Sequence, residues 1–209
     1  NKKRYALKEP LSDESKEHIE TIYNNYELLN LSYNTKLVKP TKVTNGLLFE
    51  MIEGKSLEKL LLDALDTNNV IQFQEYITKF FDFVDTLVTK RNIIFKSSVE
   101  FESVFGKWKV DEPQDIIKTS NIDLIFSNIF FDKKDEFVLI DYEWVFDFEV
   151  PKSFIIWRSL AMFSAYHQVD LSQFINVSWD MYNEDFLKLD NMFSSFVHGQ
   201  SKQYFLSHQ

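Results

Sequence analysis

A run of apolar residues at helical spacing occupies residues 70 to about 90 and limits how the chain can fold. Apolar side chains recur there every three or four positions, which is the period of one helix face. They are Val70, Phe73, Ile77, Phe80, Phe81, Val84, Leu87 and Val88. A stripe this broad must be covered over most of its surface, so the sequence predicts a buried central helix around which the other elements pack.

The segment before this helix reads as short strands with one helix. The expected elements are a strand at residues 4–8, a helix from Ser12 to about Leu31, and strands at residues 36–43 and 47–52. Asn45-Gly46 between the last two strands is a strong signal for a hairpin turn. Pro10 ends the first strand, because proline cannot donate to a sheet.

From residue 56 onward helices dominate, with a β-rich patch between them. The expected elements are a helix at 56–65, the central helix, a mostly loop segment at 92–120, strands at 122–125, 128–131 and 137–141, and helices at 151–167, 170–178 and 180–197. Pro151 suits the first position of a helix. A few strands with one helix, followed by a mostly helical remainder, predict the α+β class.

Composition and charge exclude several kinds of function. The chain has 209 residues and no cysteine, so disulfides, thiolate catalysis and thiolate zinc sites are excluded. Its formal net charge of −9 argues against a general nucleic-acid binder, because phosphate contacts need clustered Lys and Arg. The four glycines are scattered, so the chain holds no Walker loop or G-x-G-x-x-G turn. No apolar run approaches 18 residues, so we expect no transmembrane segment.

Three polar residues in and after the β-rich patch suggest phosphoryl transfer. Asp123 is followed five positions later by Asn128, and thirteen positions after that by Asp141, which ends an apolar strand. In such a site one Asp accepts the proton of the attacking hydroxyl, while the Asn and the other Asp bind Mg²⁺. The D-x-x-x-x-N spacing alone is a weak signal, because Asp and Asn commonly make turns.

Two upstream segments strengthen this interpretation. Residues 5–8, Tyr-Ala-Leu-Lys, have the form V-A-I-K, the strand that carries a lysine for the α- and β-phosphates. Residues 48–54, Leu-Phe-Glu-Met-Ile-Glu-Gly, have the form of the hinge strand that joins the two lobes of a kinase. All these elements stand in the order expected of a kinase and at plausible spacings.

The chain resembles the protein-kinase-like fold from its third strand onward. Within that fold it looks most like the kinase domains of bacterial O-antigen chain-terminating methyltransferase–kinases and related polysaccharide-assembly proteins. The closer match is carried by residues 140–148, Ile-Asp-Tyr-Glu-Trp-Val-Phe-Asp-Phe, by Val150-Pro151 and Trp157-Arg158, and by Glu17-His18-Ile19 and Asn25-Tyr26. The resemblance implies a truncated N-lobe at residues 1–53, with a small antiparallel sheet and one helix, and a mostly helical C-lobe at residues 54–209.

The resemblance assigns roles to the polar residues. Asp123 becomes the catalytic base, and Asn128 and Asp141 become the Mg²⁺ ligands. Lys8 holds the α- and β-phosphates of ATP and pairs with an acidic residue of the first helix. Glu27 and Glu20 are both candidates for that partner.

The resemblance also implies how the adenine is bound. Ala6 and Phe130 sandwich the ring from opposite sides. The Glu50 C=O accepts a hydrogen bond from the base and the Ile52 N–H donates one to it. Phe49 stands at the gatekeeper position.

The sequence departs from protein kinases at several points. The usual H-R-D is Asn-Ile-Asp at residues 121–123, so the histidine that braces the catalytic loop is missing. The usual D-F-G is Asp-Tyr-Glu at residues 141–143, and no A-P-E segment follows. These departures fit small-molecule and polysaccharide kinases, which lack a regulated activation loop. The chain starts at the third strand without an initiator Met or a glycine-rich loop, so we expect it to belong to a longer protein.

These expectations combine into one favoured function and two alternatives. The favoured function is an ATP- and Mg²⁺-dependent phosphotransferase that acts on a hydroxyl, a sugar of a surface polysaccharide, in chain termination or modification. The alternatives are a non-catalytic kinase-like docking domain of a polysaccharide-assembly protein and a small-molecule kinase of the aminoglycoside or choline type. The expected partners are a saccharide acceptor and a methyltransferase or glycosyltransferase domain of the same longer protein. We expect a cytoplasmic location, with peripheral attachment to the inner membrane through partners as a further option.

Four features each allow a structural and a functional interpretation. Asp147 is a helix cap or a substrate contact. Trp144 and Trp157 are core residues or a platform for a sugar ring. The segment 101–120, which includes Trp108, lines an acceptor site or is an ordinary loop.

Overall fold

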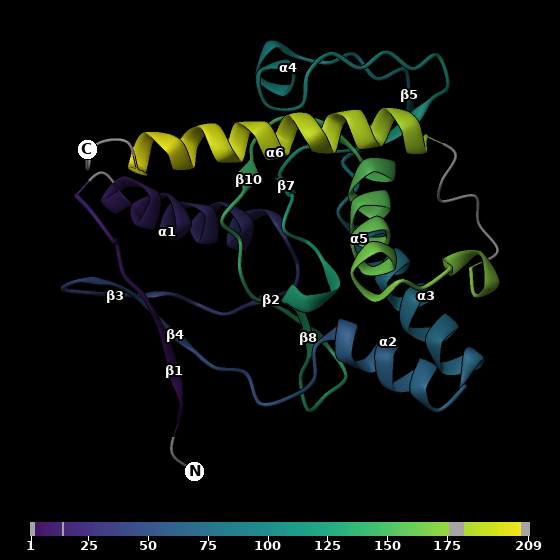
Figure 1. Ribbon diagram of the computed structural model, residues 1–209, viewed down its shortest axis with the longest axis horizontal. Coiled ribbons are helices and arrows are strands. Elements are labelled where there is room, and N and C mark those ends of the chain that lie inside the picture. Colours follow the sequence, from purple (N-terminus) through teal and green to yellow (C-terminus); the bar gives the residue numbers. More distant parts are fainter. Residues whose placement is uncertain (1–2, 14, 176–181, 206–209) are drawn as a thin grey trace.

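The computed structural model describes residues 3–13, 15–175 and 182–205 (Figure 1). In chain order the elements are β1 (Tyr5–Lys8), α1 (Ser15–Ser32), β2 (Lys36–Leu37), β3 (Thr41–Val43), β4 (Gly46–Glu50), α2 (Leu57–Asp66), α3 (Val70–Thr86), β5 (Lys90–Ile93), α4 (Val99–Phe105), β6 (Gln114–Ile117), β7 (Ser120–Asn121), β8 (Ile129–Phe131), β9 (Phe137–Leu139), β10 (Val145–Phe146), β11 (Val150–Pro151), α5 (Lys152–His167) and α6 (Asn183–Phe205). Figure 1 shows β1, β3, β4 and α1 on one side of the molecule and α2, α3 and α5 on the other, with α6 running across the upper part of the view below α4. The predicted α+β class is confirmed, as is its order: a small sheet with one helix, then a mostly helical part.

The N-terminal sheet has the strand order β1-β4-β3, and both pairings are antiparallel. The predicted hairpin is confirmed, but its two-residue turn is Thr44-Asn45 rather than Asn45-Gly46, because Val43 pairs with Gly46. Gly46 has φ +152°, and a Cβ there would lie 2.1 Å from the carbonyl oxygen of Lys8, so only glycine fits. Helix α1 buries Ile22 and Leu29 beside this sheet.

Strand β2 lies in a different sheet from β3. It pairs in parallel with β9, which in turn pairs antiparallel with β8. The strand predicted at residues 36–43 is therefore divided, at Pro40, into segments that serve two sheets. The β2–β9 pairing crosses the boundary predicted at residue 53, so the division into 1–53 and 54–209 remains a prediction.

Helix α3 is the buried central helix that the apolar stripe predicts. It buries Phe73, Ile77, Phe80, Phe83 and Val84. The Phe80 ring meets Phe126 edge-on with 5.0 Å between centroids, so the helix directly supports the turn at residues 126–128. The helix ends at Thr86 rather than near residue 90, because the chain turns there and the Thr89 N–H donates to the Ile116 carbonyl of strand β6.

The prediction of a mostly loop segment at residues 92–120 missed the short elements within it. The segment contains α4, β6 and β7, and its aromatic side chains lie in the core. Ser98 caps α4 by accepting from the Phe101 N–H, and Gly106 ends it with φ +76°. Trp108 is buried against Phe95 and Phe186, which makes it a core residue. The elements are too short for a periodic pattern to develop, although the serine and glycine caps were visible in the sequence.

The strand predicted at residues 122–125 was also wrong. The strand lies earlier, at β7, which pairs with β10. The carbonyls of Ile122 and Leu124 accept hydrogen bonds from the side chains of Arg158 and Ser159 on α5, not from a neighbouring strand. The apolar side chains of this segment are buried, but its backbone follows an irregular loop.

The C-terminal helices differ from the prediction in detail. Helix α5 confirms the helix predicted at 151–167, with Pro151 at its N-cap. Residues 171–173 form a single 3₁₀ turn, and the rest of the helix predicted at 170–178 lies partly outside the described residues. Helix α6 replaces the helix predicted at 180–197. No helix in the described ranges combines the length and apolar character needed to cross a membrane.

This packing decides the interpretation of Trp157 and excludes one of the two interpretations of Asp147. Trp157 is buried and its Nε1–H donates to Asn183 Oδ1 at 2.9 Å, so it is a core residue. Asp147 is not a helix cap, because α5 begins after Pro151, and its carboxylate accepts from the Thr119 hydroxyl at 3.2 Å.

Candidate active site

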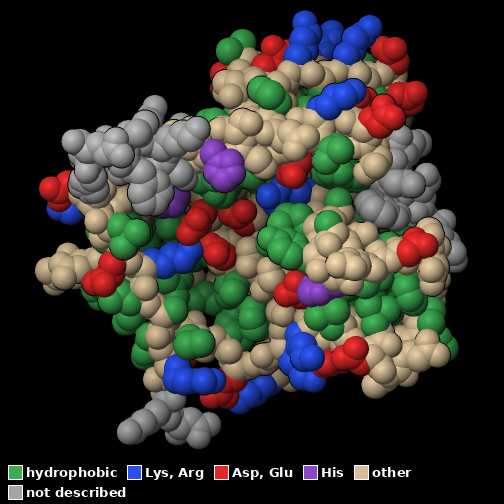
Figure 2. All heavy atoms as spheres, in the orientation of Figure 1, with side chains coloured by type: hydrophobic (Ala, Val, Ile, Leu, Met, Phe, Trp, Pro, Cys, Tyr) green, Lys and Arg blue, Asp and Glu red, His purple; other side chains and the backbone are tan. Residues whose placement is uncertain are grey.

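A cavity of about 410 Å³ lies between the N-terminal sheet on one side and strand β8 and the segment after β9 on the other. The residues that line it and that the sequence had singled out are Ala6, Lys8, Phe49, Glu50, Ile52, Phe130 and Asp141. They come from segments up to 135 positions apart in the sequence, and the fold brings them to one place. In Figure 2 this region is a hollow where acidic side chains meet a basic one above hydrophobic side chains.

Strand β1 directs Lys8 into this cavity. Side chains alternate along a strand, so Ala6 and Lys8 face the cavity while Tyr5 and Leu7 are about half exposed. The Lys8 Nζ donates to Asp141 Oδ1 at 2.9 Å and to Glu143 Oε1 at 2.5 Å. Burial lowers the pKa of Lys8, but its hydrogen bonds to Glu143 and Asp141 outweigh that effect, so the net shift is upward and Lys8 is a cation.

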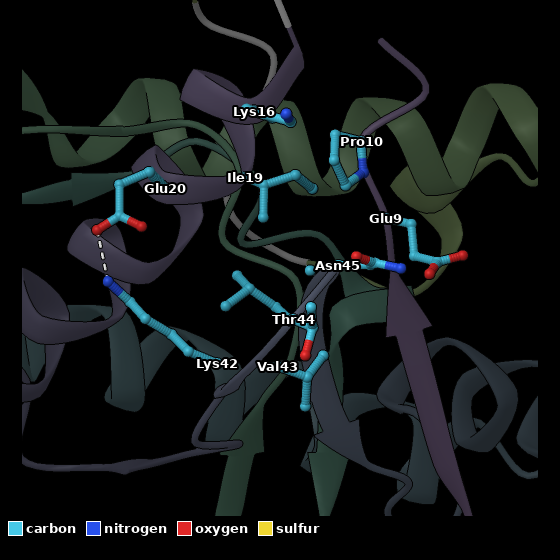
Figure 3. Close-up of a pocket in the computed structure, with 11 residues that line it drawn as sticks. Glu9, Pro10, Lys16, Ile19, Glu20, Lys42, Val43, Thr44 and Asn45 are labelled. Atoms are coloured by element: carbon cyan, nitrogen blue, oxygen red, sulfur yellow. Dashed lines mark hydrogen bonds and ion pairs between the residues drawn. The ribbon is translucent and has the colours of Figure 1, made fainter. Parts of the chain in front are cut away.

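The predicted partner of Lys8 on the first helix was wrong. Glu20 lies in another hollow, of about 480 Å³, between α1 and the β3–β4 turn, where it pairs with Lys42 (Figure 3). Glu27 is exposed on α1. Helix α1 is rotated so that neither carboxylate reaches Lys8, and the partners of Lys8 come instead from the segment 141–143.

The segment 141–143 turns sharply after β9. Asp141 has φ +51°, in the left-handed region that few non-glycine residues adopt. Tyr142 is fully buried, and its hydroxyl donates to the Val38 carbonyl. The Asn25 side chain of α1 donates to the carbonyls of both Tyr142 and Glu143, each at 2.9 Å. These contacts fix the direction in which Asp141 and Glu143 point.

The loop that carries Asp123 and Asn128 is held from several sides. Within the loop, the Asn121 Oδ1 accepts from the Asp123 N–H at 3.0 Å, and the Asn128 Nδ2 donates to the Asp123 carbonyl at 3.0 Å. Helix α5 adds the two hydrogen bonds from Arg158 and Ser159 described above. The loop thus has a brace without the histidine that kinases use.

The same loop is tied to the Asp141 segment. The Ile140 N–H donates to the Asn128 carbonyl at 2.9 Å, and the Trp144 N–H donates to Asp123 Oδ2 at 3.0 Å. These two hydrogen bonds join the loop of Asp123 and Asn128 to the segment of Asp141. Asp141 lines the cavity, whereas Asp123 and Asn128 are not among its lining residues, and their roles stay predictions.

Burial and neighbouring charges shift the acids of the site in opposite directions. Burial raises the pKa of Asp123 to about 7, and the nearby carboxylates of Asp141 and Glu143 act in the same direction. The Arg158 guanidinium and the Trp144 N–H oppose this shift without cancelling it. The His18 imidazole, 3.7 Å from the carboxylate, and then Lys8 lower the pKa of Glu143 to about 2. At neutral pH, Asp123 can exchange a proton, whereas Glu143 stays charged.

The oxygen atoms that the site offers are too few to hold Mg²⁺ without a further ligand. Within the described ranges no cluster of three or more His, Asp or Glu side chains could hold a metal ion. Asp141 and Asn128 offer one carboxylate and one amide oxygen, since the amide uses its nitrogen to donate to the Asp123 carbonyl. Mg²⁺ commonly takes one or two protein oxygens and completes its shell with phosphate and water. The residues therefore fit a metal that arrives with a polyphosphate.

Sequence reasoning missed Glu143 as the partner of Lys8 and missed Asn25, Arg158 and Ser159 as supports. Asn25 gave a usable signal, because it is a polar residue on the apolar face of a helix, and it is only 6% exposed. A buried amide requires partners, so such a position indicates a specific backbone contact.

Comparisons with known proteins give distant structural likenesses only. Macrolide 2′-phosphotransferase MphH from Brachybacterium faecium is 9% identical, with a TM-score of 0.43, and the match covers 97% of this chain and 82% of that one. An ethanolamine kinase of Plasmodium vivax is 14% identical, with a TM-score of 0.43, over 93% of this chain and 62% of that one. APH(2″)-IIa in its gentamicin complex is 12% identical, with a TM-score of 0.37, over 96% of this chain and 85% of that one. No protein-family model and no curated protein matches the sequence. At these sequence identities and TM-scores, the substrates of these proteins do not indicate a substrate for this chain.

Asp123→Asn is expected to stabilise the protein at about pH 8 but not at about pH 4. Because the folded state raises the pKa of Asp123, the folded protein binds more protons than the unfolded chain between about pH 4 and pH 7. The wild-type protein therefore loses stability as the pH rises through that window, whereas the amide does not titrate. At about 1.4 kcal/mol per pKa unit and after relaxation, we expect a gain on the order of 1–3 kcal/mol.

Urea denaturation without Mg²⁺ or nucleotide measures this gain. The matched control is Asp111→Asn, which removes a largely exposed carboxylate. A difference between Asp123→Asn and the wild type that stays constant from about pH 4 to pH 8 would contradict the account.

Proposed function

We propose that this chain is an ATP- and Mg²⁺-dependent phosphotransferase whose acceptor is a hydroxyl group. The observation that carries the proposal is the shared cavity, which has an apolar part between Ala6 and Phe130 and a charged end at Lys8 and Asp141. Its volume, about 410 Å³, suits a small-molecule ligand. An aromatic base beside a polyanion matches this division of apolar and charged surface.

The proposed pose places the adenine at the hinge strand. Phe49, Glu50 and Ile52 stand at the end of β4 and line the cavity. In this proposal the Glu50 carbonyl accepts from the base, the Ile52 N–H donates to it, and Phe49 limits the depth of the cavity. Lys8, on β1, lines the charged end of the cavity, so in this pose its ammonium group lies at the phosphates.

Asp123 is the proposed general base. Its carboxylate oxygen takes the proton of the acceptor hydroxyl. The hydroxyl oxygen then bonds to the γ-phosphorus of ATP, and the bond between that phosphorus and the β–γ bridging oxygen breaks, which releases ADP. A pKa of about 7 suits this task near neutral pH. Asp141 and Asn128 would hold Mg²⁺, which supplies positive charge for the phosphate oxygens. Most of the catalysis is positioning, which the braces on both loops provide.

The finer proposal is that the acceptor is a sugar of a surface polysaccharide. Its support is the resemblance of residues 140–148 to the polysaccharide-assembly kinases. Trp144 belongs to this segment, and its backbone N–H contacts Asp123. The indole packs edge-on against Phe193 and is only partly buried, so a sugar contact stays a prediction. The proposal includes a methyltransferase or glycosyltransferase domain in the same longer protein, and the division into lobes at residue 53.

Asp141→Ala is expected to abolish the Mg²⁺-dependent part of nucleotide binding. MgATP at about 100 times its Kd should stabilise the wild-type protein by about 2.7 kcal/mol, which raises the melting temperature of a chain this size by roughly 5–10 °C. Asn128→Ala should reduce this shift less, because a neutral amide neutralises no charge. Thermal unfolding with and without Mg²⁺ measures both, with Asp111→Ala as the control. Equal nucleotide binding by Asp141→Ala in both conditions would contradict the assignment.

Asp123→Asn is expected to keep the MgATP-induced shift and to lose turnover by about 10²–10⁴-fold, because it removes the base and no principal metal ligand. The measurement is ATP consumption with a panel of glycan acceptors, with Asp111→Asn, at an exposed carboxylate, as the matched control. Normal turnover in Asp123→Asn would place the base elsewhere. Absence of both MgATP binding and turnover in the wild-type protein would favour the non-catalytic docking function.

A further inference from the structure

Helix α1 contacts the phosphate-binding end of the cavity indirectly, through the segment 141–143. We propose that Glu143 and Asn25 are positioning residues for Lys8: Glu143 supplies the carboxylate partner of the lysine, and Asn25 fixes the peptide that carries Glu143. This inference rests on the proposed function, because it concerns the lysine that would hold the phosphates.

Lys8 has two carboxylate partners, Asp141 and Glu143. The proposed chemistry assigns only Asp141 a second task, which is to bind Mg²⁺. Asp141 Oδ1 lies 2.9 Å from the Lys8 Nζ, and Glu143 Oε1 lies 2.5 Å from it. With Mg²⁺ bound, Asp141 would serve as its ligand, and Glu143 would be the partner that keeps the lysine in place. The three side chains are each about one-third exposed, so a ligand can reach them while the ion pairs remain partly shielded.

Asn25 orients Glu143 through the backbone. Its side chain is only 6% exposed and gives both amide hydrogens to consecutive carbonyls, those of Tyr142 and Glu143. Asp141, which precedes these two residues, has a left-handed backbone conformation. A buried amide that satisfies two carbonyls fixes the direction of the chain at that point.

A second residue of α1 meets Glu143 from the same face. His18 Nε2 lies 3.7 Å from Glu143 Oε2, and its ring packs on Trp144 with 5.7 Å between centroids. His18 and Asn25 are seven positions apart, which is two helical turns, so both lie on one face of α1. Ile22 lies between them and lines the cavity. The helix therefore presents an imidazole, an apolar side chain and an amide to the site, in place of the glutamate expected there.

The position of Tyr142 makes this arrangement stable. Its ring is fully buried and lies 6.1 Å from Tyr26 and 6.4 Å from Phe49, measured between centroids. Its hydroxyl donates to the Val38 carbonyl. Since Tyr142 is anchored between Asp141 and Glu143, the two carboxylates keep a fixed relation to one another and to Lys8.

The test is a double-mutant cycle on MgATP affinity. Glu143→Gln keeps the size of the side chain and removes its charge, and it should raise the Kd for MgATP about tenfold to hundredfold, the usual effect of losing a charged hydrogen bond. In the Lys8→Met background the same substitution should change the Kd by less than about twofold, because its effect acts through the lysine. Asn25→Asp should also weaken binding, since it places a negative charge against two carbonyl oxygens.

The control variants are Glu20→Gln and Glu27→Gln, which alter the two glutamates of α1. Each should have a Kd for MgATP within about twofold of the wild-type value. A loss from either of them, or an equal loss from Glu143→Gln with and without Lys8, overturns the inference. Retained MgATP binding by Glu143→Gln also overturns it, while leaving the proposed function intact. Failure of the wild-type protein to bind MgATP is a separate result that overturns the proposed function, and this inference with it.

Discussion

The ion pairs of Lys8 with Asp141 and Glu143 join the beginning of the chain to a segment more than 130 positions later. They place strand β1 against the turn that follows β9, and the cavity lies between these elements. Partly shielded charges of opposite sign attract one another strongly only when both are held in place. The structure provides this restraint through the β1–β4 pairing on one side and through Asn25 and Tyr142 on the other.

Several features near the site lower stability rather than raise it. Burial raises the pKa of the Asp123 carboxyl, and Asp141 is a non-glycine residue with positive φ. In the described part of the chain, the buried side-chain polar atoms without a hydrogen-bond partner are Ser120 Oγ and Asn121 Nδ2, just before Asp123. Such features persist where the surrounding structure enforces them and commonly mark functional sites. Here helices α3 and α5 supply that support, through Phe80 and through the hydrogen bonds of Arg158 and Ser159.

The sequence predicted the parts of this structure that depend on local patterns. The β3–β4 hairpin, the central helix and the strand that carries Ala6 and Lys8 all follow from neighbouring residues. The short elements between residues 92 and 120 did not, because their aromatic side chains are buried without a repeating period. The partner of Lys8 was missed for a different reason. It depends on the rotation of α1 and on the turn at Asp141, both of which are set by tertiary packing, whereas kinase spacing alone pointed to Glu20 and Glu27.

We propose that a nucleotide brings a divalent metal to Asp141, which lines the cavity, and to Asn128 in the adjoining loop. Replacing Mg²⁺ by paramagnetic Mn²⁺ and recording the backbone amide resonances, with and without a non-hydrolysable ATP analogue, tests it directly. The account predicts that resonances of the loop around Asn128 and of the segment after Ile140 broaden strongly, and only when the nucleotide is present. Broadening centred elsewhere, or equal broadening without the nucleotide, would contradict it.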